Sequence, residues 1–167
     1  MGWEVFPLAI RRIVNGNHAI LRSHARPVQK INDAIITLLD DMAETMYENK
    51  GVALAAPQIG IAKRLIVVDP GEDRLIKLIN PRCLEWEGET VDVEGCLSIP
   101  GIYGEVPRAS RVLVEALDTR GKQLRLEAEG FLARILQHEI DHLDGILFLD
   151  RAIRLVDPEE EKKEEGS

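Results

Sequence analysis

Hydrophobic residues recur at helical spacing in two segments of the chain. In the first, Asn32 or Asp33 provides a favoured helix N-cap, and apolar side chains follow every three or four residues, at Ile35, Leu38, Leu39, Met42 and Met46. In the second, the apolar run from Phe131 continues through Leu143, and Gly145 follows as a C-terminal cap. The pattern predicts a first helix that ends near Lys50-Gly51 and a second that ends just before Gly145.

Strand patterns occupy the region between these two helices. Leu65-Ile66-Val67-Val68 and Leu75 to Ile79 are short apolar runs, which are typical of buried strands. Apolar residues then alternate with polar ones on both sides of a turn at Gly121, at Val112, Val114 and Ala116 and again at Leu124, Leu126 and Ala128. This alternation predicts a β-hairpin that leads into the second helix. The chain therefore has the element content of an α+β fold.

Composition indicates one ordinary globular domain. The 167 residues are 45% hydrophobic and 30% charged, enough for a single core, which we assign to residues 1–156. Residues 157–167 are charged and lack an apolar stripe, so we expect a disordered acidic tail. The net charge of −8 argues against direct nucleic-acid binding. No apolar run approaches membrane-spanning length, and Met1 to Phe6 show no export or myristoylation signal. We expect a cytoplasmic protein with no membrane contact, or an organellar one if a transit peptide was removed.

The second helix carries the strongest chemical signal in the chain, the sequence His138-Glu139-Ile140-Asp141-His142. Residues four apart on a helix share a face, so two imidazoles at this spacing can hold one metal ion, and Glu139 beside them can act as a base. A solvated amphipathic helix would show the same pattern. The surrounding apolar residues favour the metal site, because buried imidazoles need partners.

A catalytic metal usually takes three protein ligands, so the two histidines require another donor. Cys96 is the best candidate, because glycines and a proline around it indicate a constrained turn. Cys83 lacks such a setting and is expected to be a small buried residue. The alternatives are a disulfide between the two cysteines, which a reducing compartment disfavours, and a Cys-His nucleophile pair, which leaves the second histidine and Glu139 without a role.

Three segments carry a family resemblance. Residues 51–58 (GVALAAPQ), 94–98 (EGCLS) and 137–142 (QHEIDH) occur in this order and resemble the three signature motifs of peptide deformylases. Shorter matches at 13–22, 106–108 and 117–118 extend the resemblance to roughly residues 8 to 150. It implies the deformylase fold, in which small, mostly antiparallel sheets pack around a central metal-binding helix.

The resemblance also implies an activity and a set of roles. Deformylases hydrolyse the N-formyl group from the initiator methionine of new polypeptides and release formate. Their metal, most often Fe²⁺ with Zn²⁺, Ni²⁺ or Co²⁺ as substitutes, would be held here by Cys96, His138 and His142. Glu139 would be the general base and acid, and the side chain of Gln58 and the backbone amide of Leu97 would stabilise the oxyanion. The partners would be N-formylmethionyl nascent peptides, with transient ribosome contact.

Further residues are assigned to the substrate pocket and to ligand orientation. The resemblance places Val52, Phe131 and Ile135 beside the methionine side chain, although ordinary core packing would look the same in sequence. Glu94, Arg108 and Asp141 are the charged residues expected to orient the ligands, with a surface ion pair as the alternative. Gln58 could instead cap the turn after Pro57. Ala53 stands where the family usually has glycine, and its methyl group could narrow the cleft.

Two other protein classes remain at this point. A general zinc peptidase also uses the His-Glu-x-x-His pattern, but it would not explain residues 94–98 or 55–58. A non-catalytic metal-binding protein with this fold would retain the same ligands, and Ala53 keeps that alternative open.

Overall fold

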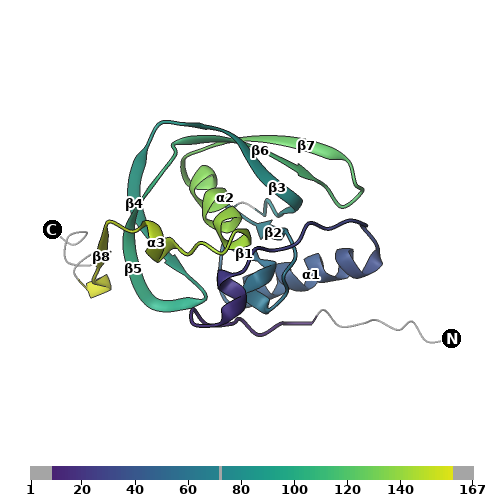
Figure 1. The fold of residues 1–167 in the computed structure, drawn as a ribbon, viewed down its shortest axis with the longest axis horizontal. Helices are drawn as coiled ribbons and strands as arrows, with labels where there is room; N and C mark the ends of the chain where they lie inside the picture. Colours follow the sequence, from purple (N-terminus) through teal and green to yellow (C-terminus); the bar gives the residue numbers. More distant parts are fainter. Residues whose placement is uncertain (1–8, 72, 160–167) are drawn as a thin grey trace.

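The computed structural model describes residues 9–71 and 73–159, in which helices and antiparallel sheets are mixed (Figure 1). In chain order the elements are η1 (Ala19–Arg22), α1 (Asp33–Glu48), β1 (Ala53–Ala55), η2 (Ala56–Ile59), β2 (Leu65–Val68), β3 (Ile76–Glu87), β4 (Thr90–Cys96), β5 (Ile99–Arg108), β6 (Arg111–Leu117), β7 (Gln123–Glu129), α2 (Gly130–Leu143), α3 (Phe148–Arg151) and β8 (Arg154–Val156), where η marks a 3₁₀-helix. The predicted α+β class is confirmed.

A five-stranded sheet in the order β1-β2-β3-β6-β7 forms the main layer, and all its neighbouring strands are antiparallel. Its second strand explains why helices cover both faces. Ile66 and Val68 pack in the cluster that contains α2, whereas Leu65 and Val67 pack in the cluster that contains α1. Because successive strand residues point to opposite faces, a run of four buried aliphatic residues requires cover on both sides.

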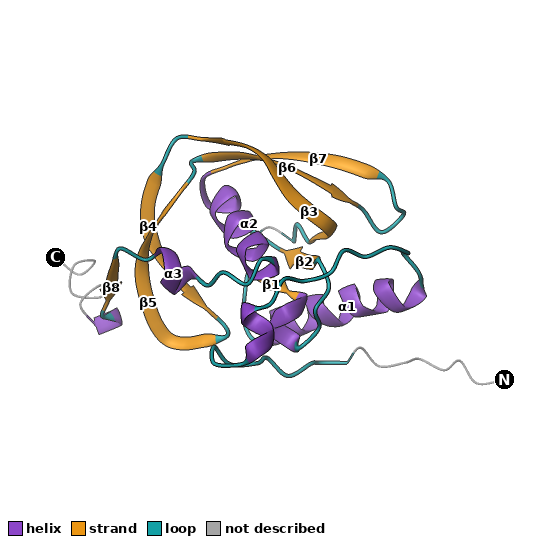
Figure 2. Ribbon diagram, viewed as in Figure 1, coloured by secondary structure: helices purple, strands orange, loops and turns teal. Residues whose placement is uncertain are grey.

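The smaller sheet, in the order β4-β5-β8, lies on the other side of α2. Figure 2 shows α2 crossing the middle of the molecule, with β3, β6 and β7 arching over it and the β4–β5 hairpin beside it. The predicted arrangement of small antiparallel sheets around one central helix is therefore confirmed. Both faces of α2 are enclosed, and ten of its fourteen residues are buried.

The helix ends follow the predicted capping signals. Asn32 caps α1, because its side chain accepts a hydrogen bond from the backbone N–H of Ile35 at 3.1 Å. After α2, Gly145 adopts a φ of +74°, and a Cβ there would lie 2.6 Å from the backbone oxygen of Arg22. Glycine is thus required both by the left-handed conformation and by the close approach of η1.

The strand predictions were partly right. Leu65–Val68 and the hairpin of β6 and β7 match the pattern, whereas the strand expected at residues 75–79 begins at Ile76 and runs on to Glu87. Strands β1, β4, β5 and β8 were not predicted. The calls on Met1 to Phe6 and on most of the acidic tail fall outside the described residues. No helix in the described ranges has the length and apolar character needed to span a membrane.

Candidate metal centre

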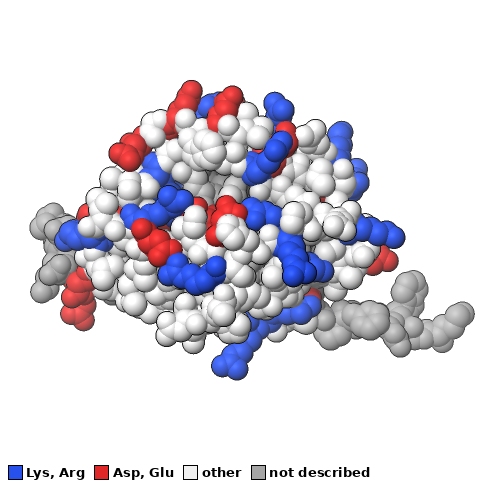
Figure 3. Space-filling model, in the orientation of Figure 1, with Lys and Arg blue, Asp and Glu red and all other residues white. Residues whose placement is uncertain are grey.

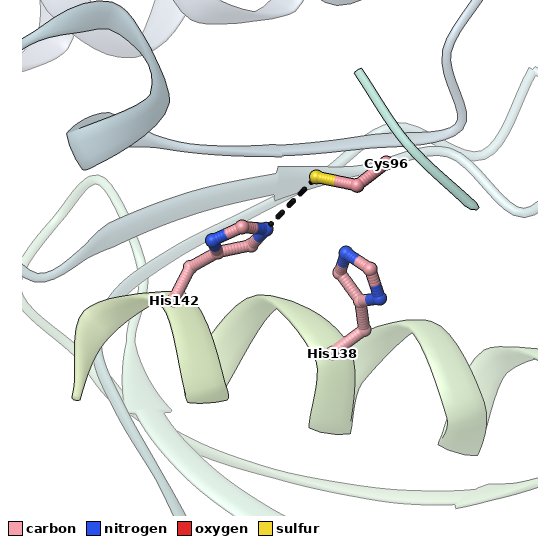
Figure 4. Close-up of side chains that lie close together, drawn as sticks. All are labelled: Cys96, His138 and His142. Carbon is pink, nitrogen blue, oxygen red and sulfur yellow. Dashed lines mark hydrogen bonds between the residues drawn. The ribbon is translucent and has the colours of Figure 1, made fainter. Parts of the chain in front are cut away.

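The two histidines of α2 and Cys96 converge on one point (Figure 4). The sulfur of Cys96 lies 3.3 Å from Nε2 of His142, and one potential ligand atom from each residue lies within 4.8 Å of the others. The imidazole rings are 5.0 Å apart between centroids. The histidines are close because they are four residues apart on one helix, whereas the sulfur comes from β4 in the smaller sheet.

Cys96 is positioned by a tight turn between β4 and β5. Cys96 pairs with Ile99, so Leu97 and Ser98 form the two-residue connection. Before the cysteine, Gly95 lies against an aromatic ring, and a Cβ on it would come within 2.7 Å of Tyr103. A side chain at position 95 would therefore push against the ring and shift the strand that carries the sulfur.

Glu94 contacts the first histidine, His138. One of its oxygens accepts from Nδ1 of His138 at 2.8 Å, which leaves Nε2 of that ring as the nitrogen available to a metal. Arg108 donates to both carboxylate oxygens at 2.8 and 2.9 Å, and Arg134 donates at 2.6 Å. Burial raises the pKa of Glu94, but hydrogen bonds from Arg108 and His138 outweigh it and lower the pKa to about 2. The carboxylate is therefore charged at physiological pH.

A second carboxylate continues this network along α2. Asp141 accepts a hydrogen bond from Arg108 at 2.6 Å and two from Arg151 at 2.6 and 3.0 Å. Arg108 thus joins Glu94 on β4 to Asp141 on the helix. The structure brings together all three charged residues that were predicted to orient the ligands, and they are buried rather than in a surface ion pair.

Two polar atoms at the centre have no hydrogen-bond partner among the described residues. They are Oε2 of Glu139 and Nδ1 of His142, and both are buried. Burial raises the pKa of Glu139 to about 7, and it lowers the pKa of His142 well below its ordinary value. Near neutral pH, Glu139 can therefore both accept and release a proton, and His142 is neutral, which is the form that could bind a metal ion.

Gln58 lies at the sulfur of Cys96. Its side-chain oxygen accepts from the backbone N–H of Ala55 at 2.9 Å, and its Nε2 lies 3.5 Å from Sγ of Cys96 and 3.3 Å from the hydroxyl of Ser98. The capping interpretation of this glutamine is confirmed, because the oxygen end of the amide caps η2, and the nitrogen end lies beside Cys96, where the oxyanion role would require it. Leu97 follows Cys96 directly in the turn.

A cleft of about 460 Å³ opens beside these residues. Its lining includes every residue predicted for the substrate pocket: Val52, Ala53, Phe131 and Ile135. Val52 and Phe131 are 41% and 54% exposed, so they are not ordinary core residues, whereas Ile135 is buried. Ala53 of β1 pairs with Val68 of β2, and its φ is not positive. The backbone at this position is therefore compatible with alanine.

The residues present fit a divalent cation. Burial alone would lower the pKa of His138, but hydrogen bonds to Cys96 and Glu94 raise it to about 10, so this position favours positive charge, which a bound cation would supply in place of the proton on Nε2. One thiol and two imidazoles are a donor set that suits Fe²⁺, Co²⁺, Ni²⁺ and Zn²⁺. Cys83 contributes nothing here; it is half-buried against the core that contains α2, and burial raises its thiol pKa to about 11.

Three residues of the site were missed from sequence. Arg134 binds Glu94, Ser98 contacts Gln58, and Tyr103 packs on Gly95. Arg134 had a usable signal, because it lies four residues before His138 and hence on the same helix face. Ser98 and Tyr103 depend on contacts between distant segments, for which the local pattern carries no signal.

The sequence is similar to those of known proteins from one family. A family model described as polypeptide deformylase matches residues 10–158. A peptide deformylase from Pelotomaculum thermopropionicum is 56% identical over 156 residues, covering 92% of this chain and 100% of the relative.

Solved structures agree with the sequence relatives. The peptide deformylase of Thermotoga maritima has a TM-score of 0.84 and 42% identity, with 86% of this chain and 98% of that chain covered. A class I type b peptide deformylase from Acinetobacter baumannii, solved with Met-Ala-Ser bound, has a TM-score of 0.82 and 37% identity, with 86% of this chain and 99% of that chain covered.

Proposed function

The chain belongs to the polypeptide deformylase family, whose members are hydrolases that remove the N-formyl group from nascent polypeptides, and we propose that Cys96, His138 and His142 hold the divalent ion that this chemistry needs. The convergence of their three ligand atoms within 4.8 Å is the observation that carries the proposal. The two histidines come from α2 and the thiol from β4, so the site forms only in the folded chain.

Ferrous iron is the ion we propose, with Zn²⁺, Ni²⁺ or Co²⁺ able to replace it. The thiolate and two imidazoles accept all four, and the thiolate makes the centre sensitive to oxygen. When bound, the ion supplies Lewis acidity that lowers the pKa of water toward neutrality. We expect activity to fall during aerobic storage of iron-loaded protein, and full activity after days in air would contradict the assignment of iron.

Glu139 is the proposed proton carrier. Its pKa of about 7 lets the carboxylate take a proton from the attacking water and then deliver it to the nitrogen of the departing amine. The C–O bond to the formyl carbon forms first and gives a tetrahedral oxyanion; the C–N bond then breaks as the nitrogen takes the proton, and the products are formate and a free methionine amine. Burial of Glu139 keeps the proton from exchanging with bulk solvent between the two transfers.

Gln58 and Leu97 are proposed to stabilise the oxyanion. Nε2 of Gln58 already lies beside Cys96, and the backbone N–H of Leu97 belongs to the turn that follows it. A donor aimed at a developing oxyanion contributes about 3 kcal/mol to lowering the barrier. The contribution matters here because a thiolate ligand donates charge to the ion and reduces its Lewis acidity.

The substrate is proposed to lie between two sheet edges. Strand β1 is the edge of the larger sheet, and β4 is an edge of the smaller one. Residues of both strands line the cleft, so an extended peptide can pair with their free backbone groups. Phe131 and Ile135, one helical turn apart on α2, then form an apolar wall for the methionine side chain.

We propose that the enzyme works in the cytoplasm and contacts the ribosome only transiently. The chain has a net charge of −8, which repels the phosphates of ribosomal RNA. On the face shown in Figure 3, Lys and Arg side chains are interspersed with Asp and Glu, as in a surface that does not concentrate positive charge. Tight, salt-sensitive co-sedimentation with ribosomes would contradict this proposal.

The decisive experiment is formate release from formyl-Met-Ala-Ser by protein purified without oxygen and loaded with Fe²⁺. We expect rapid release that disappears in Glu139→Gln while the bound metal remains. Metal binding without release from the wild-type protein would indicate a binding role. Cleavage of internal bonds in unformylated peptides would instead indicate a general peptidase.

A further inference from the structure

One lysine lies at the opening of the substrate cleft. The charged side chains that line the cleft are Lys50, Glu94, Arg134 and Glu139, together with His138. Arg134 and Glu94 are buried and paired with each other at 2.6 Å, and Glu139 is the proposed proton carrier. Lys50 is exposed, and it makes no ion pair within 4 Å in the part of the chain that the structure describes. It is therefore the cleft's available positive charge.

The backbone holds Lys50 in a defined place. The residue follows the C-cap of α1 and has a φ of 56°, in the left-handed region where glycine or asparagine is usual. Its N–H donates to the carbonyl of Tyr47, and the N–H of Gly51 donates to Met46 at 2.9 Å, which closes the end of the helix. An amino acid with a side chain is disfavoured here, yet the chain has a lysine.

This loop is also fixed to the metal centre. Gly51 packs against Leu97, and a Cβ on it would lie 2.7 Å from the leucine side chain. Because Leu97 directly follows Cys96, the backbone beside Lys50 has a set position relative to the reaction centre. Lys50 is therefore anchored to the cleft at its backbone, although its side chain extends into solvent.

The direction of β1 indicates which part of a substrate would pass this lysine. Gln58, beside Cys96, follows the C-terminal end of β1, whereas Lys50 precedes its N-terminal end. A peptide whose formyl group lies at Cys96 and whose backbone follows β1 must run toward Lys50. Ala53 is three residues from Lys50, and because the backbone turns at Lys50 the two residues lie no more than about 10 Å apart, the span of three extended residues. The residues just after the initiator methionine therefore lie closest to the lysine.

We propose that Lys50 is a specificity-determining residue that favours substrates with an acidic side chain at the second or third position after formyl-methionine. The inference rests on the proposed binding of the peptide along β1. An exposed pair of opposite charges contributes little binding energy. We therefore expect a peptide with an acidic residue at this position to have a two- to fivefold lower KM at low salt than the same peptide with a neutral residue, with kcat unchanged. The preference should largely vanish in 0.5 M salt, where screening is strong.

The test compares three amidated peptides, formyl-Met-Ala-Asp-Ala, formyl-Met-Ala-Asn-Ala and formyl-Met-Ala-Lys-Ala, with a parallel series that moves the variable residue by one position. Wild type is measured beside Lys50→Gly, which suits the left-handed backbone, and Lys50→Glu. Lys122→Glu is the matched control, because Lys122 precedes β7 at the opposite edge of the sheet from β1.

We expect Lys50→Gly to abolish the preference for the Asp peptide over the Asn peptide. Lys50→Glu should instead prefer the Lys peptide over the Asn peptide, and Lys122→Glu should behave as the wild type does. A preference that survives in Lys50→Gly, or that Lys122→Glu changes equally, would overturn the proposal. The neutral Asn peptide reports on deformylation itself, so its turnover separates failure of the lysine role from failure of the proposed function. Binding of the deformylated peptides gives the same charge comparison without catalysis.

Discussion

Replacing Arg134 with methionine should destabilise the protein far more than removing a surface arginine. Arg134 is 6% exposed, and its guanidinium donates to Glu94 at 2.6 Å, to the carbonyl of Val106 at 2.8 Å and to the carbonyl of Thr90 at 3.0 Å. Methionine fills similar space but has no donor, so it leaves a buried carboxylate with fewer partners and removes the guanidinium donors from the carbonyl groups of Val106 and Thr90.

The expected magnitude follows from that geometry. Breaking a buried ion pair by removing one partner costs about 3 to 5 kcal/mol. Glu94 keeps its bonds to Arg108 and His138, so the lower end of that range applies, and we expect the free energy of unfolding to fall by about 3 kcal/mol. Arg134→Lys, which retains the charge but not the fork of donors, should lose less.

Urea denaturation of metal-free protein measures this loss without the stabilisation that a bound ion adds. Arg82→Met is the matched control, because Arg82 pairs with Glu115 at 2.8 Å but its side chain is 69% exposed, and such pairs contribute at most about 1 kcal/mol. If Arg134→Met lost less than about 1 kcal/mol, as little as Arg82→Met, the reasoning would be refuted. Arg108 and His138 would then suffice to hold Glu94.

Four other substitutions test three further predictions. His138→Ala should lose bound metal, whereas Glu139→Gln should keep it and lose turnover; equal metal loss in both, measured by elemental analysis, would undermine their separate roles. Ala53→Gly should leave kcat/KM within about twofold and lower the free energy of unfolding by about 0.5 to 1 kcal/mol, because the alanine backbone is unstrained; a large gain in kcat/KM would show that the methyl group obstructs the cleft. The hydrogen bond to Asp69 raises the pKa of Tyr47 to about 12, above the unfolded value near 10, so its stabilisation should be complete below pH 10 and be lost between pH 10 and 12. Alkaline unfolding of Tyr47→Phe should lack that dependence, and an unchanged profile would exclude the tyrosine as its source.

The features best predicted from the sequence are those that lie within a single helix or strand. His138 and His142 are one turn apart on α2, so local spacing alone placed them together, and the four aliphatic residues of β2 predicted a buried strand, which the structure confirms. Strand β4 was not predicted although Val91 and Val93 alternate with polar residues, because this run is short and ends at Gly95, and β5 was not predicted because two prolines and two glycines interrupt its pattern. Arg134 was not predicted although it shares a helix face with His138, because its partner, Glu94, lies forty residues away in the sequence.

Glu94 links the packing of the fold to the proposed metal site. The carboxylate comes from β4, and it binds Arg108 of β5 and Arg134 and His138 of α2. It therefore ties the smaller sheet to the central helix while it orients a ligand ring, and its removal would affect both properties at once. Arg134 shares the structural half of this role, because it contacts Glu94 but has no contact with the ligand atoms among its hydrogen bonds in the described residues. A loss of stability in Arg134→Met with metal affinity preserved would show that the two roles of the carboxylate are distinct, whereas parallel losses would show that holding the sheet on the helix is itself what positions His138.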